Sequence, residues 1–99
     1  MNLNVNKLIE YPKEGIASKV VKGTKKFDIT LFCMTGRTEI GEHTSTRQGI
    51  VYVLEGKGIF NLEGKNIKME QGKLIFMNKN ARHSLKAKKN TAFLLMLFK

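Results

Sequence analysis

Apolar and polar positions occur in short runs along this chain, and glycines separate the runs. Five segments are rich in β-branched, aromatic and other apolar residues: 27–34, 50–54, 59–62, 74–77 and 92–98. Such residues favour strands. Nine glycines leave intervals of about strand length between most of them, and no segment combines a long helical period with a cap. The pattern predicts an all-β fold, a meander of short antiparallel strands.

Turn residues stand at the expected ends of several strands. Gly and Asn, which tolerate positive φ, occur at 55–56, 63–64 and 78–80. The alternation of Asn with apolar residues at 2–6 predicts an edge strand, and Pro12 then presets φ for a turn.

The segment 92–98 is apolar at every position, so both faces of this strand are expected to be buried. One face would line the interior. The other needs a cover, for which the N-terminal segment 3–11, a second sheet or another subunit are all suitable. We therefore expect a homodimer as one way to cover the strand.

The length of 99 residues fits one domain spanning 1–99, because it leaves no room for a second hydrophobic core. Apolar residues make up 41% of the chain and charged residues 26%, close to the globular average. Composition therefore predicts a folded domain and excludes a disordered one.

The formal net charge of +10 arises from 18 Lys and Arg against 8 Asp and Glu. The basic residues are scattered, with small clusters at 22–26 and 86–89, where turns or strand edges are expected. Lysines that protect sheet edges from aggregation account for this distribution. A field that attracts small anions is the next interpretation, and nucleic-acid binding ranks last because stacking aromatics do not accompany the charges.

The single cysteine, Cys33, excludes an intrachain disulfide and favours a reducing, cytoplasmic location. The first residues contain no apolar run of signal-peptide length, and the apolar stretch 92–98 is too short to span a bilayer. Neither secretion nor membrane insertion is expected.

Two histidines, His43 and His83, have the most evident ligating or catalytic character. They stand on different predicted strands, so the fold decides whether they meet. Imidazole binds divalent metals, forms hydrogen bonds and titrates near neutral pH. A Ser-His-Asp triad, a phosphate-binding glycine loop and a CxxC pair are not apparent.

The segments that contain these histidines resemble known motifs. Residues 36–56 read GRTEIGEHTSTRQGIVYVLEG, and residues 72–83 read GKLIFMNKNARH. Together they resemble the two motifs of the cupin family, and the phrase YVLEG at 52–56 is similar to the end of the first motif. The resemblance implies a small antiparallel β-barrel, or double-stranded jelly roll, with 27–98 as its core and 1–26 adding N-terminal strands and turns.

In metal-binding cupins the first motif supplies two histidines and a glutamate, and the second motif supplies another histidine. Aligned backward from Gly56, His43 matches the first histidine and Ser45 stands at the second. Gly49 then stands at the glutamate, and His83 matches the histidine of the second motif. The resemblance in this register implies two of the four ligands.

A second register places His43 at the second histidine and Gln48 at the carboxylate. His43, Gln48 and His83 would then hold Fe, Mn, Ni or Zn with positions open for water or substrate. Alternate strand residues point to opposite faces, so this register requires a bulge near 46–47.

The resemblance implies that a small polar or anionic molecule binds where His43 and His83 meet, with Ser45, Arg47 and Gln48 nearby. Two functions remain open. One is a divalent-metal-dependent enzyme, and the other is a metal-free sensor or accessory protein, in which the histidines bind a carboxylate, phosphate or sugar. Members of one fold differ in function, so the resemblance predicts a pocket and leaves the reaction open.

Overall fold

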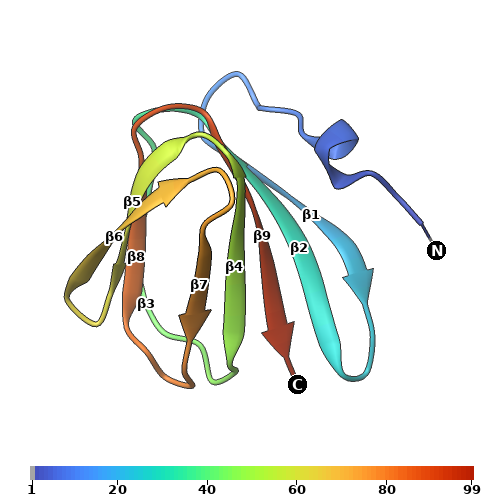
Figure 1. Cartoon of the computed structure of the whole chain (residues 1–99), viewed down its shortest axis with the longest axis vertical. Helices are drawn as coiled ribbons and strands as arrows, with labels where there is room; N and C mark the ends of the chain where they lie inside the picture. Colours follow the sequence, from blue (N-terminus) through green and yellow to red (C-terminus); the bar gives the residue numbers. More distant parts are fainter. Residues whose placement is uncertain (1) are drawn as a thin grey trace.

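The computed structural model describes residues 2–99 and consists of strands with one short helix (Figure 1). No helix in that range is long and apolar enough to cross a membrane. In chain order the elements are a 3-10 helix η1 (Val5–Leu8), β1 (Ile16–Gly23), β2 (Phe27–Met34), β3 (Glu39–His43), β4 (Gly49–Glu55), β5 (Lys57–Leu62), β6 (Lys65–Glu70), β7 (Leu74–Met77), β8 (His83–Ala87) and β9 (Thr91–Phe98).

The strands form two antiparallel sheets that face each other. One has the order β1-β2-β9-β4-β7, and the other has the order β3-β8-β5-β6. The all-β prediction is confirmed. The described strands form two separate sheets and do not close into a barrel. This arrangement is consistent with the other predicted form, a double-stranded jelly roll.

Gly56 alone separates β4 from β5 and carries the chain from one sheet to the other. Its φ is +108°, and a Cβ at this position would lie 2.5 Å from the carbonyl oxygen of Asn90 and from Cα of Thr91. Both the backbone angle and the lack of space therefore require glycine at this corner.

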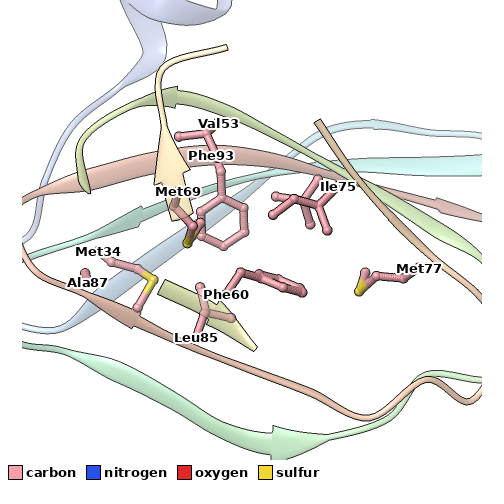
Figure 2. Packing of buried hydrophobic residues seen from close by; sticks show 10 residues of the cluster. Met34, Val53, Phe60, Met69, Ile75, Met77, Leu85, Ala87 and Phe93 are labelled. Atoms are coloured by element: carbon pink, nitrogen blue, oxygen red, sulfur yellow. The ribbon is translucent and has the colours of Figure 1, made fainter. Parts of the chain in front are cut away.

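An inner cluster of apolar side chains lies between the two sheets (Figure 2). Phe60 from the four-stranded sheet is 1% exposed, and Phe93 from the five-stranded sheet is 3% exposed. Phe93 also stacks on Phe32 with ring centroids 5.1 Å apart. The buried members are Met34, Val51, Val53, Phe60, Met69, Ile75, Met77, Leu85, Ala87 and Phe93.

An outer cluster lies on the opposite face of the five-stranded sheet. Its buried members are Leu31, Cys33, Leu54 and Ala92, and the partly buried residues packed on them are Val5, Leu8, Ile9, Tyr11, Val21 and Leu94. Tyr11 also donates a hydrogen bond to Glu55 at 2.7 Å. Of the three expected covers for β9, the N-terminal segment thus covers the part of its outer face around Ala92 and Leu94.

The edge strand predicted at residues 2–6 is wrong, because the chain forms η1 there. The Asn4 side chain accepts a hydrogen bond from the amide of Asn6 and caps this turn. In a 3-10 helix residues three apart share a face, which brings Val5 and Leu8 onto the outer cluster together. The N-terminal region still contributes a strand, β1, to the sheet edge.

Candidate functional site

Two loops meet at one end of the sandwich, at the lower edge of Figure 1. Residues 44–48 join β3 to β4, and residues 78–82 join β7 to β8. The amide of Asn80 donates to the carbonyl of Ser45 at 2.7 Å, which holds the loops together. Asn80 has φ +63°, in line with the turn predicted there. We call this end the mouth.

His43 ends β3 and reaches the interior because of a β-bulge. Ile40 pairs with Leu85, and His43 pairs with His83, so three steps on β3 match two on β8. The extra residue restores His43 to the same face as Ile40. This bulge lies at Gly41 and Glu42, earlier in the chain than the bulge that the second motif register required.

His83 begins β8 and lies deeper than His43, with 7% of its surface exposed. Its ring stacks almost parallel on Phe60 with centroids 5.8 Å apart, and the ring of His43 meets it edge-on at 4.0 Å. The structure therefore brings together the two histidines that the sequence singled out, one exposed at the mouth and one buried.

Both rings use the same nitrogen to bond the backbone. Nδ1 of His43 lies 2.8 Å from the carbonyl oxygen of Gly41, and Nδ1 of His83 lies 3.0 Å from that of Ala81. A carbonyl can only accept, so each Nδ1 carries the proton. In the neutral rings Nε2 then keeps its lone pair.

The two histidines line a cavity of about 160 Å³ between the sheets. Its remaining lining side chains are apolar: Phe32, Ile40, Val51, Phe60, Met77, Leu85, Phe93 and Leu95. Because alternate residues of a strand share a face, Leu85 lies on the inner face together with His83. A hollow of about 350 Å³ lies elsewhere, beside Tyr11 and Cys33 on the outer side, but the histidines do not line it.

Burial in these apolar surroundings lowers the pKa of His83. The hydrogen bond to the Ala81 carbonyl opposes this shift, and the neighbouring His43 adds to it. Burial therefore favours the neutral form of the His83 ring.

The other sequence-predicted site residues do not line the cavity. Arg47 forms an ion pair with Asp28 at 3.1 Å, and the Ser45 hydroxyl accepts a hydrogen bond from the amide of Arg47. Gln48 is exposed, and its carbonyl accepts from the amide of Phe98. These three residues belong to the mouth loop that follows His43.

Gly49 is the motif position that does lie on the inner face. It is buried, and a Cβ there would lie 3.1 Å from Cε of Met77 and 3.0 Å from Cδ2 of Leu97. Neighbouring side chains thus occupy the space where the first register expects a carboxylate. Sequence reasoning did not single out Phe60 or Ile40 as cavity residues, although Phe60 falls in a predicted strand.

The residues present do not complete a metal site. No group of three or more His, Cys, Asp or Glu residues in the range 2–99 is arranged to hold a metal ion. The two Nε2 atoms are suitable donors, but typical catalytic zinc sites use three protein ligands. Gly49 offers no donor side chain, and Gln48 lies outside the cavity.

The fold and the paired histidines define a small jelly-roll protein with an interior site at one end. The family model described as a cupin domain matches residues 30–98, and the chain belongs to the cupin family. No curated protein matches it.

Several solved structures share the fold. A conserved protein of unknown function from Streptococcus pyogenes is 22% identical, with a TM-score of 0.89 over 100% of this chain and 87% of that one. A cupin superfamily protein from Desulfitobacterium hafniense is 15% identical, with a TM-score of 0.89 over 99% and 90%. A predicted oxalate decarboxylase from Thermotoga maritima is 19% identical, with a TM-score of 0.76 over 84% and 79%. At these identities the similarity concerns the fold alone.

Proposed function

We propose that this chain binds one small organic molecule in the interior cavity, with His43 at the rim and His83 inside as its polar contacts. The proposal is carried by the pair of imidazole rings 4.0 Å apart on the wall of an otherwise apolar cavity. A few convergent polar groups in an apolar concavity are typical of ligand sites.

The size of the cavity limits the ligand. Its volume of about 160 Å³ is close to the roughly 150 Å³ of an engineered protein cavity that binds benzene. The part of the ligand that enters therefore has about the bulk of one six-membered ring. Any larger portion would remain in the mouth beside Ser45 and Asn80.

Methyl NMR of the full chain tests this proposal with an internal control. Small ring compounds with one polar substituent should shift the methyl signals of Met77 and Leu85 in the cavity and leave Leu31 in the outer cluster unmoved. A His43→Leu, His83→Leu double variant should bind them at least about tenfold more weakly. If compounds of this size leave Met77 and Leu85 unshifted at every attainable concentration, the proposal is wrong.

A metal-dependent enzyme is the second candidate, because cupins often bind a divalent metal and both Nδ1 atoms are anchored to carbonyls. Such an anchor is the usual support of a histidine that binds metal through its other nitrogen. Elemental analysis of protein purified without an affinity tag or chelator tests this candidate. Near-stoichiometric Fe, Mn, Ni or Zn that is lost in a His43→Ala, His83→Ala double variant would favour it over the metal-free binding protein.

The same cavity serves a sensor or accessory protein as readily as an enzyme, so the proposal assigns no reaction. A cytoplasmic location remains a prediction from the lone Cys33, which is buried and unpaired.

A further inference from the structure

Both histidines of the cavity are fixed in one tautomer by their surroundings. The carbonyls of Gly41 and Ala81 accept from Nδ1, at 2.8 Å from His43 and 3.0 Å from His83. Each neutral ring therefore presents only the Nε2 lone pair to a ligand, and a lone pair accepts hydrogen bonds but cannot donate them.

The rest of the wall adds no donor. The other eight lining side chains belong to Phe, Ile, Val, Leu and Met, of which only the Met77 sulfur has any polar character, as a weak acceptor. A ligand that enters this cavity thus meets two good acceptors and an apolar surface. If the ligand offers no donor to Nε2 of the buried His83, this nitrogen becomes a buried polar group with its water removed, which is unfavourable.

No positively charged side chain lines the cavity, and Lys79 in the 78–82 loop is exposed. Arg47 is paired with Asp28, and Arg82 lies on the surface, 3.9 Å from Glu42. A carboxylate in the cavity would face the Nε2 lone pair of the buried His83 without a counter-ion. Burial and the neighbouring ring both lower the pKa of His83, which disfavours the imidazolium that a carboxylate would need.

We infer that the cavity selects neutral hydrogen-bond donors, that is, a hydroxyl group on a compact apolar body such as a phenol or small cyclic alcohol, over carboxylates of the same size. The inference rests on the proposed binding function and names its ligand class. Of the polar or anionic ligands expected from the sequence, it favours the neutral polar ones. The hydroxyl donates to one Nε2, and the apolar body fills the space between Phe60 and Met77.

Three probes of similar size test this selection. Phenol carries a donor, anisole carries an acceptor only, and benzoate carries a negative charge. Binding is measured at neutral pH from the methyl signals of Met77 and Leu85. Phenol should bind about five- to tenfold more tightly than anisole, the value of one neutral hydrogen bond, with benzoate weaker than phenol by at least as much.

Two variants test whether the histidine rings cause the preference for phenol over anisole. A His83→Leu variant and a His43→Leu variant, each checked for folding by the unchanged Leu31 methyl signals, are compared by the ratio of their affinities for phenol and anisole, because the change in the cavity wall affects both probes. In the variant that lacks the Nε2 atom to which the phenol hydroxyl donates, phenol should no longer bind more tightly than anisole.

The outcomes separate the two proposals. Equal binding of phenol and anisole, or tighter binding of benzoate than of phenol, would overturn donor selection while leaving the binding cavity in place. A preference for phenol that persists in both variants would also overturn it. If all three probes leave Met77 and Leu85 unshifted up to their solubility limits, the proposed binding function itself fails.

Discussion

The inner and outer clusters bury apolar side chains by different means. The inner cluster is enclosed by two sheets, and its large side chains, Phe60 and Met69, are at most 1% exposed. The outer cluster is one sheet face covered by an irregular segment, from which Leu8 and Tyr11 remain partly exposed. We therefore expect the inner cluster to carry most of the free energy of folding and the outer cluster to be the first to open.

The largest effect should come from truncation in the inner cluster. Phe60→Ala should lower the free energy of unfolding by about 3–5 kcal/mol, since it removes a fully buried ring and leaves a void. Urea denaturation measures this loss. Ile59→Ala is the matched control, because this neighbour on β5 faces the other way and is only half-buried. An equal loss in the two variants would contradict the assignment of Phe60 to the main core.

A smaller effect is expected from the outer cluster. Leu8→Ala should cost about 1–2 kcal/mol, less than a fully buried leucine, because Leu8 is already partly exposed. The loss should be local, so trypsin should cleave after Lys7 and Lys13 faster while phenol binding in the cavity stays unchanged. A parallel loss of binding would mean that the two clusters open as one unit.

Lowering the pH should reduce the free energy of unfolding, because His83 beside the inner cluster is harder to protonate in the folded state. The folded state holds the pKa of this ring below the ordinary 6.5, so the unfolded chain takes up the proton first. His83 therefore leaves the free energy of unfolding unchanged above pH 6.5. This free energy falls as pH decreases from 6.5 toward the pKa of the folded state. Urea denaturation between about pH 7 and about pH 5 should show this decline, and His83→Gln should reduce it. An identical pH slope in the variant would exclude His83 as the cause.

The smallest effect on folding is expected on the part of the outer face that the N-terminal segment leaves uncovered. Phe76, Ile50 and Met96 are neighbours across strands there, and Phe76 is 65% exposed. The homodimer expected from the sequence remains a prediction, and this row of side chains is where we expect a second copy to pack. Phe76→Ser should change the free energy of unfolding by no more than about 0.5 kcal/mol.

Sedimentation equilibrium over a range of concentrations measures that association. Phe76→Ser should weaken it, and Val20→Ser is the control because Val20, at 67% exposed, lies on β1, away from this row. If the wild-type chain stays monomeric at every concentration, the predicted homodimer is excluded.

The sequence predicts the apolar strands well and the charged ones poorly. The predicted strand 27–34 matches β2 residue for residue. In contrast, β1 and β6 carry lysines on their exposed positions, and neither was among the predicted apolar runs. Alternation at residues 2–6 was misleading, because a local cap by Asn4 and burial of Val5 and Leu8 outweigh a period of two over so short a segment.

The candidate site could be predicted only as far as its two histidines. Motif spacing identifies His43 and His83, but the direction in which each side chain points depends on the pairing of β3 with β8. The bulge at Gly41 and Glu42 arises from that pairing. For the same reason Gln48 could not be excluded from the sequence, whereas in the fold it is exposed in the mouth loop.

The place of β9 also constrains how the protein is made. This strand lies between β2 and β4 and pairs with both, yet residues 91–98 are synthesised after every other strand. Until residues 91–98 have been made, β2 and β4 therefore each lack one pairing partner and expose apolar strands. We expect the five-stranded sheet to form in one late, cooperative step that begins only when β9 is available.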